Sequence, residues 1–315
     1  MTASTQEVVT EPAQRGRLAI TRIDLAMVCV ALIWGVNFTI VKEAITEMSP
    51  MVFISIRFVL SSAFLVAVLK ISGGDLHFDR AHLGRIALMG FVGNTLYQVF
   101  FIQGLARTTA NNSSILLATS PIFVTVLSVL LNLEVTTSVM WLGVALSFVG
   151  TVMIVGLDAA GGLSLGSGML VGNLLTLGAT LCWSAYTLMA KPLLRHYPPI
   201  KLTALSMLIG TAFLVLFSLG DLTRQQWADV TVRGWLGLAY SFVFANSIAY
   251  MIWNTSVYKV GNVRTAVIAN LTPVITVIVS WVFLGETLGF LQGVGVLLTL
   301  LGITLTRLRS APRPT

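Results

Sequence analysis

Residues 24–42 read DLAMVCVALIWGVNFTIVK, and residues 173–191 read NLLTLGATLCWSAYTLMAK. Both stretches are apolar over about 20 residues, the length at which a helix crosses a hydrocarbon layer about 30 Å thick. Each carries a Trp-x7-Lys pattern, Trp34 to Lys42 in the first and Trp183 to Lys191 in the second. Two such helices, offset by 149 positions, indicate an internal repeat.

The whole chain has the composition of a membrane protein. Of its 315 residues, 56% are hydrophobic and 10% are charged, whereas soluble domains average about 25% charged residues. Because lipid offers the backbone no hydrogen-bond partner, apolar segments of this length must span as helices. The sequence therefore predicts an all-α integral membrane protein of ten transmembrane helices, near residues 24–42, 50–70, 83–105, 112–132, 138–156, 168–190, 201–219, 233–256, 263–284 and 287–306.

The positions of the basic residues predict the orientation. With a cytoplasmic N-terminus, fourteen of the 19 Lys and Arg residues lie on the cytoplasmic side, four lie outside, and Arg57 lies within a helix. Both tails, residues 1–23 and 307–315, are then cytoplasmic, which agrees with an even number of spans. This distribution explains the net charge of +7 better than nucleic-acid binding does, and we expect the lipid bilayer and a small-molecule substrate as partners.

A second offset extends the repeat. Shifting the chain by 152 positions aligns Asn94 with Asn246, Pro121 with Pro273, Ser128 with Ser280, and Glu134 with Glu286. The expected halves are residues 24–158 and 168–306. Since each half has an odd number of helices, five, the second must be inverted, as in secondary transporters whose solute site lies between the halves. A duplicated membrane protein without a transport role is the alternative.

The chain resembles the EamA-type members of the drug/metabolite transporter superfamily. The resemblance rests on the repeated Trp-x7-Lys pattern, on Arg57 early in the second helix, and on the Pro-x12-Glu pairs that begin at Pro121 and Pro273. It implies a basket of helices around a central cavity, with the fifth and tenth helices peripheral. Among bacterial members the chain looks most like the amino-acid exporters of the YddG type, which implies aromatic and other neutral amino acids as substrates and the inner membrane as location.

Aromatic and amide side chains share faces of four predicted helices at i, i+3, i+4 and i+7 spacing. Such faces suit a planar, zwitterionic solute. The alternatives are packing, an interfacial aromatic belt, and amides that join helices. The candidate substrate-binding residues are Trp34, Asn37, Asn94, Tyr97, Gln98, Phe101, Trp183, Tyr186, Asn246, Tyr250, Trp253 and Asn270.

A further set of residues has candidate roles as hinges or gates. Pro121 and Pro273 are predicted to lie within helices, where proline bends the backbone. Lys42 and Lys191 end helices, where a cation either complements the helix dipole or closes a gate. Arg57 either snorkels to the outer surface or has a buried partner. Glu134 and Glu286 are expected to act as caps or turn anchors.

The absence of several sequence motifs limits the classes of function that the protein can have. No Asp or Glu lies at the centre of a predicted helix, so gradient-driven movement is favoured over proton coupling through a buried acid. There is no Walker, HExxH or Cys-x-x-Cys motif, so we expect no catalytic residue, metal or cofactor. The sequence thus predicts an exporter or facilitator of aromatic and other neutral amino acids that works by alternating access. The alternatives are an exporter of drug-like or phosphorylated metabolites and, less favoured, a membrane enzyme or a non-transporting scaffold. The oligomeric state stays open, with a monomer possible.

Overall fold

Helices make up nearly all of the structure that the chain adopts. The computed structural model describes residues 21–130, 134–135, 138–156, 168–269, 271–307 and 311–312. The first half contains α1 (Arg22–Glu47), α2 (Pro50–Ile71), η1 (Arg80–His82), α3 (Leu83–Gly90), η2 (Phe91–Leu96), α4 (Tyr97–Arg107), α5 (Ala110–Ala118), α6 (Ser120–Leu130), β1 (Glu134–Val135) and α7 (Ser138–Gly156).

The second half repeats this order. It contains α8 (Gly168–Leu193), α9 (Pro199–Arg224), η3 (Trp227–Asp229), α10 (Val232–Tyr240), η4 (Ser241–Ile248), α11 (Ala249–Ala269), α12 (Leu271–Leu284), α13 (Phe290–Arg307) and β2 (Ala311–Pro312). The two-residue strands β1 and β2 pair antiparallel.

The lengths of these helices fit a bilayer. Among the described residues, six helical runs are long and apolar enough to cross a membrane: Arg22–Glu47, Pro50–Ile71, Arg80–Arg107, Gly168–Leu193, Pro199–Arg224 and Val232–Val260. Trp141–Ile154, Leu271–Leu284 and Phe290–Gly302 are shorter apolar helices, and α5 and α6 form an interrupted helix between α4 and α7. In its described residues the chain is therefore helical apart from the pair of two-residue strands, and it crosses the membrane several times.

Local sequence explains where several helices begin. Thr21 and Asp24 form a capping box at the start of α1. Pro50 and Pro199 occupy the first turns of α2 and α9, where proline needs no hydrogen-bond partner.

Two long runs contain a π-helical segment, η2 in the first half and η4 in the second. The offset of 152 positions carries residues 91–96 to 243–248, which lie inside η4. π-helical segments are rare in proteins, and many of those that do occur lie at functional sites. Its recurrence at equivalent positions therefore marks the same region in both halves.

Of the two predicted mid-helix prolines, Pro121 follows an interruption of the helix. α5 ends at Ala118 with Thr119 as its C-cap, and Pro121 is the second residue of α6, a first turn where proline is well tolerated. In the second half Pro273 is the third described residue of α12, and residue 270, between α11 and α12, lies outside the described residues.

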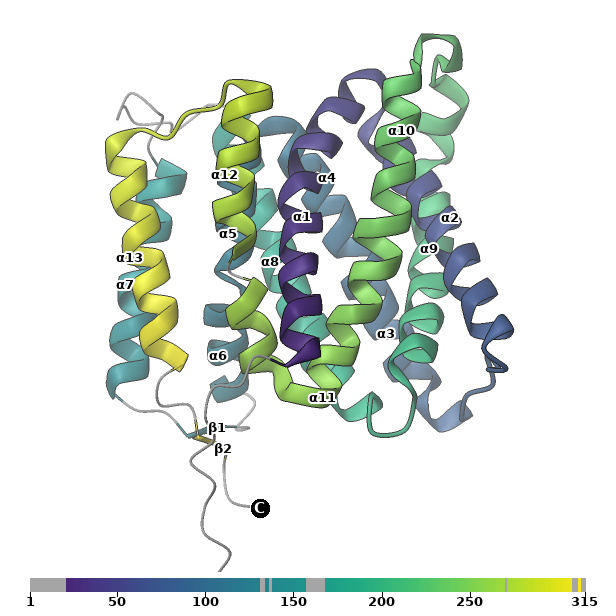
Figure 1. The fold of residues 1–315 in the computed structure, drawn as a ribbon, viewed down its shortest axis with the longest axis horizontal. Helices are drawn as coiled ribbons and strands as arrows, with labels where there is room; N and C mark the ends of the chain where they lie inside the picture. The colour runs from purple at the N-terminus through teal and green to yellow at the C-terminus, as the bar shows by residue number, and fades with distance from the viewer. Residues whose placement is uncertain are drawn as a thin grey trace, which may run out of the picture.

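Figure 1 shows the arrangement of the helices, with α7 and α13 packed together at the left edge. A Cβ on Gly150 would meet the carbonyl of Gly295, and a Cβ on Gly302 would meet that of Gly143. These glycines let the two backbones approach closely, as small residues do in membrane helices.

Several direct contacts join residues that the repeat makes equivalent. Their separations are 149 or 152 positions, the two offsets read from the sequence. The pairs are Ser62–Thr211 (Oγ to Oγ1, 2.8 Å), Trp34–Trp183 (ring centroids, 6.0 Å), Gln98–Tyr250 (Nε2 to OH, 3.2 Å) and Ser147–Thr299 (Oγ to O, 3.1 Å).

The bundle has two ends, which we name after a lysine at each. At the Lys42 end, the upper end in Figure 1, α1 and α4 finish and α5 begins. At the Lys191 end α8 finishes and α9 begins, and the start of α1 lies there together with the end of α13.

The close packing of α7 on α13 makes a specific prediction about Gly302. Alanine is a better helix former than glycine by about 1 kcal/mol, yet a Cβ at Gly302 would overlap backbone atoms of α7. We expect Gly302→Ala to lower the free energy of unfolding by about 1–3 kcal/mol, measured by equilibrium unfolding in mixed micelles. The control is Gly293→Ala on the same helix, where a Cβ would meet nothing within 4 Å. Equal stability of the two variants would contradict the packing.

Candidate functional site

Eight aromatic rings from four helices meet in the interior, and we call them the aromatic cluster. Ring contacts connect every member to the next. The members are Trp34 and Phe38 of α1, Tyr97 and Phe101 of α4, Trp183 and Tyr186 of α8, and Tyr250 and Trp253 of α11.

Trp183 is the centre of the aromatic cluster. Its ring centroid lies 5.2 Å from that of Tyr97, 5.3 Å from that of Tyr186, and 5.4 Å from those of Tyr250 and Trp253. Most of these pairs are tilted or edge-on, the arrangements that aromatic quadrupoles favour. Trp183 is buried, whereas Trp34 and Tyr97 keep partial exposure at the margin of the cluster.

The rings reach the interior because they lie three or four residues apart on their helices. Trp34 and Phe38, Trp183 and Tyr186, and Tyr250 and Trp253 each occupy one helix face. The predicted aromatic residues are thus brought together: all seven of them belong to the cluster.

Hydrogen bonds fix several of the rings. Trp34 Nε1 donates to the carbonyl of Ala245 in η4 at 2.9 Å. Asn254 Nδ2 donates to the hydroxyl of Tyr186 at 3.1 Å. The Nε1 of Trp253, by contrast, is buried without a hydrogen-bond partner.

Arg57 lies beside the aromatic cluster and does not snorkel, because only 1% of it is exposed. Its Nη2 donates to Gln98 Oε1 at 2.5 Å, and Gln98 Nε2 donates to the hydroxyl of Tyr250 at 3.2 Å. Of the two predicted alternatives for Arg57, the structure shows the buried partner. This partner is the amide of Gln98, which links Arg57 to the ring of Tyr250.

The predicted amides other than Gln98 have different surroundings. Asn37 Oδ1 accepts a hydrogen bond from Ser241 at 2.7 Å, which joins α1 to η4. Asn94 lies against Gly210 of α9, and both atoms of its amide lack partners. Asn246 is buried in η4 with its Nδ2 unpartnered. Asn270 lies outside the described residues.

Two residues of the site were not among those predicted. Phe38 extends the aromatic cluster through Phe101, at 5.6 Å between centroids. Asn254 holds Tyr186 and also donates to Thr203 Oγ1 at 2.8 Å. Helical spacing offered a signal for both, since Phe38 follows Trp34 by four residues and Asn254 follows Tyr250 by four.

At the Lys42 end, two charged side chains bind the turn between α4 and α5. Lys42 Nζ donates to the carbonyl of Leu105 at 2.8 Å and to that of Thr108. Glu286 accepts from the backbone N–H of Ala110 at 2.9 Å and of Asn111 at 3.0 Å. The cation thus lies at a helix C-terminus and the anion at a helix N-terminus, which matches the helix dipoles. We call these the Lys42–Glu286 contacts.

These contacts confirm Glu286 as a cap and correct the expectation for Lys42. Lys42 was expected to complement the C-terminal dipole of its own helix, but it binds that of α4. At the other end its counterpart Lys191 is exposed and has no hydrogen bond or ion pair with any described residue. The two ends of the bundle therefore differ at equivalent positions.

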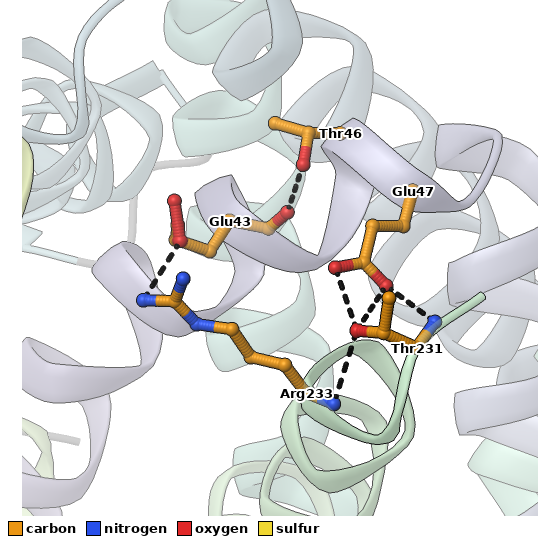
Figure 2. A network of polar contacts seen from close by, with 5 residues as sticks. All are labelled: Glu43, Thr46, Glu47, Thr231 and Arg233. Carbon is orange, nitrogen blue, oxygen red and sulfur yellow. Dashed lines mark hydrogen bonds and ion pairs between the residues drawn. The ribbon is translucent and has the colours of Figure 1, made fainter. Parts of the chain in front are cut away.

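Polar contacts also tie α1 to α10 at the Lys42 end, as Figure 2 shows. Arg233 Nη2 lies 3.3 Å from Glu43 Oε2, and the backbone N–H of Thr231 donates to Glu47 Oε2 at 2.9 Å. Below them a groove of about 460 Å³ runs between α1, α10 and α12, with mostly apolar walls that include Ile40 and Phe283.

At the Lys191 end an exposed ion pair joins the two halves. Asp75 accepts from Lys201 Nζ at 2.7 Å and from the backbone N–H of His77 at 2.6 Å. The hydrogen bond from Lys201, followed by that from His77, lowers the pKa of the Asp75 carboxyl. Because the pair is exposed, it fastens the loop after α2 only weakly.

The described residues contain no group of three or more His, Cys, Asp or Glu side chains that could hold a metal ion. Cys29 and Cys182 are both free thiols, one exposed and one buried. The chemistry that the site offers is therefore aromatic contact, amide hydrogen bonding and one buried cation.

The hydrogen bonds of the tryptophans predict unequal effects of two similar substitutions. Trp34→Phe leaves the carbonyl of Ala245 without its donor, whereas Trp253→Phe removes an N–H that has no partner. We expect the first to lower the free energy of unfolding by about 1–3 kcal/mol more than the second, measured by unfolding in mixed micelles. Equal losses would mean that the bond to η4 contributes nothing to stability.

Comparison with known proteins agrees with this architecture. An uncharacterized transporter of Archaeoglobus fulgidus is 30% identical over 295 residues, covering 91% of this chain and 97% of that protein. The uncharacterized transporter YyaM of Bacillus subtilis is 23% identical, covering 85% and 88%. A WAT1-related chloroplastic protein of Arabidopsis thaliana is 26% identical, covering 86% and 66%. A solved structure described as a crystal structure of protein shares the fold, with a TM-score of 0.67, 18% identity, and coverage of 91% and 96%.

The EamA-like transporter family matches the chain twice, over residues 21–156 and over residues 170–308. Both matches together cover most of the 315 residues. Long apolar helices, a buried polar and aromatic interior, and relatives named as transporters all fit this result. The chain belongs to the EamA-like transporter family and is a multi-pass membrane transporter.

Proposed function

We propose that this protein carries small solutes with a planar apolar body, above all aromatic and other neutral amino acids, across the bacterial inner membrane. The aromatic cluster is the observation that carries the proposal. Rings from α1, α4, α8 and α11 converge in the interior of a membrane protein, and amides and hydroxyls lie among them. Such a site binds a planar solute by ring contacts and orients it by hydrogen bonds.

The carrier consists of ten spans in two inverted halves, residues 24–158 and 168–306. Three observations support this arrangement: the family matches each half separately, the π-helices recur at one offset, and equivalent residues contact each other in four places. Contacts between equivalent residues are expected along a twofold axis. In transporters with inverted repeats, solutes bind at such an axis near the midplane.

Transport proceeds by alternating access, with the two ends opening in turn. The difference between Lys42 and Lys191 supports this mechanism. These lysines are equivalent in the repeat, but Lys42 donates to backbone carbonyls, whereas Lys191 is exposed and has no partner among the described residues. The positive-inside bias assigns the Lys42 end to the periplasm. In the conformation described, the Lys42–Glu286 contacts hold the periplasmic end together, and Pro121 and Pro273 serve as the hinges of the gating helices.

The small number of cations near the aromatic cluster argues against phosphorylated metabolites as solutes. A phosphate carrier needs several cations at its site, and Lys42 is committed to the carbonyls of Leu105 and Thr108. In the described part of the chain, Arg57 is the cation that contacts a residue of the site. Among the described residues, the hydrogen bonds of the aromatic cluster involve no Asp or Glu, so movement down a gradient is favoured over proton exchange at the cluster.

The function is tested by counterflow of labelled L-phenylalanine into proteoliposomes without a pH gradient. We expect uptake by the wild type, and a rate about tenfold lower for Trp183→Ala, because the central ring of the cluster is removed. Trp141→Ala is the control, since Trp141 is an exposed residue of α7. Absence of uptake of every amino acid by the wild type would overturn the proposal, as would a strict requirement for an imposed pH gradient.

The gate is tested by weakening the cap on α5. Glu286→Gln keeps the shape of the side chain but removes its charge from the helix N-terminus, at a cost of about 0.5–2 kcal/mol. In a Tyr97→Cys variant that lacks Cys29 and Cys182, the introduced thiol should then react severalfold faster with a membrane-impermeant thiol reagent added from the periplasmic side.

The matched control for the gate is Glu43→Gln at the same end. Glu43 pairs with the exposed Arg233, and such pairs contribute little, so its labelling rate should equal that of the parent. Equal labelling rates for Glu286→Gln and Glu43→Gln would show that the Lys42–Glu286 contacts do not govern opening.

A further inference from the structure

Arg57 is a buried cation without a carboxylate partner in the part of the chain that the structure describes. Only 1% of the residue is exposed, and its single hydrogen bond runs from Nη2 to Gln98 Oε1. Its Nε is buried and has no partner. The rings of Phe53 and Phe58 flank the guanidinium at 5.4 Å and 5.7 Å from Cζ.

A guanidinium in this state has unused binding capacity. Arginine stays protonated in proteins and presents five N–H donors in a planar fork that matches a carboxylate. One neutral amide satisfies one of these donors. Since an unpaired charge is costly to bury in a membrane protein and commonly marks a functional site, the free donors fit an anion that arrives with the ligand.

The position of Arg57 relative to the aromatic cluster defines the shape of this ligand. Gln98 bridges Arg57 to the hydroxyl of Tyr250, and the ring of Tyr250 lies 5.4 Å from that of Trp183. A ligand whose aromatic body lies among the rings therefore meets Arg57 with a polar group attached close to that body. A carboxylate there replaces Gln98 Oε1 as the acceptor.

The repeat indicates that one anionic group is bound and no more. The offset of 149 positions, which pairs Ser62 with Thr211, brings Ser206 to the place of Arg57 in the second half. The hydroxyl of Ser206 donates to the carbonyl of Thr203 at 3.1 Å. Among the described residues, the hydrogen bonds and ring contacts of the aromatic cluster involve no Asp or Glu, so an ammonium group finds no carboxylate partner there.

We propose that Arg57 binds the carboxylate of an aromatic monocarboxylate, and that the amino group of an amino acid is not required for recognition. This inference rests on the proposed function, because it takes the aromatic cluster as the solute site. It goes further by assigning the charged contact to one residue and by widening the substrate class to aromatic acids that lack an amine.

The test compares four ligands that share one phenylethyl body. They are 3-phenylpropionate, with a carboxylate; 2-phenylethylamine, with an ammonium; L-phenylalanine, with both; and 3-phenylpropanamide, with neither. Binding to the purified full chain is followed by tryptophan fluorescence at pH 7.5. We expect 3-phenylpropionate and L-phenylalanine to bind with similar affinity, and the other two about tenfold or more weaker, as the strength of charged hydrogen bonds requires.

Two variants separate a binding role from a structural one. In Arg57→Gln, 3-phenylpropionate should fall to the affinity of 3-phenylpropanamide, while the affinity for 3-phenylpropanamide itself stays unchanged. A merely structural Arg57 would instead weaken all four ligands together. Arg224→Gln, at an exposed arginine, is the control and should match the wild type. If Arg57→Gln fails to fold, the wild-type series decides alone: binding of 2-phenylethylamine as tight as that of 3-phenylpropionate overturns the inference.

Counterflow keeps this inference distinct from the proposed function. Uptake of L-phenylalanine by a wild type that shows no preference for carboxylates would leave transport standing and remove the role of Arg57. Arg57-dependent binding of 3-phenylpropionate without uptake of any amino acid would leave the anion site standing and remove the amino-acid transport proposal.

Discussion

Everything in this structure depends on one constraint: lipid offers no hydrogen bond to a backbone that leaves the regular helix. The chain departs from the α-helix at η2 and η4, and side chains of the protein bind carbonyls of η4. Trp34 donates to the carbonyl of Ala245, and Ser61 donates to that of Phe242. One amide in each π-helical segment, Asn94 in η2 and Asn246 in η4, is buried.

The same constraint explains the charged residues at the Lys42 end. The turn between α4 and α5 leaves carbonyls at one helix end and N–H groups at the other. Lys42 supplies the donor for the first, and Glu286 supplies the acceptor for the second. Both partners come from other helices, α1 and the residues just after α12, so the turn is satisfied only while these helices are together. Satisfying the backbone of this turn thus also holds α1, α4 and α5 and the segment after α12 together.

The sequence predicted the helices and the aromatic residues of the site better than it predicted the partners. A spacing of three or four residues was enough to predict that Trp34, Trp183 and Tyr250 lie on the interior faces of their helices, because a helix face is determined by local sequence. The π-helices have no comparable local signal, and the pairing of Arg57 with Gln98 depends on how α2 packs on α4. Asn94, predicted to bind the solute, lies against Gly210 of α9 with both atoms of its amide unpartnered, a packing arrangement that helical spacing alone does not reveal.

The contacts between equivalent residues have a consequence for how the two halves diverged. If the halves began as identical chains, a residue on the twofold axis between them contacted its own copy, and its side chain had to be complementary to itself. Gln98 and Tyr250 now form a donor–acceptor pair of unlike residues, which two identical chains do not offer. A single chain is free of this self-complementarity, so a buried Arg57 can stand where the second half carries Ser206.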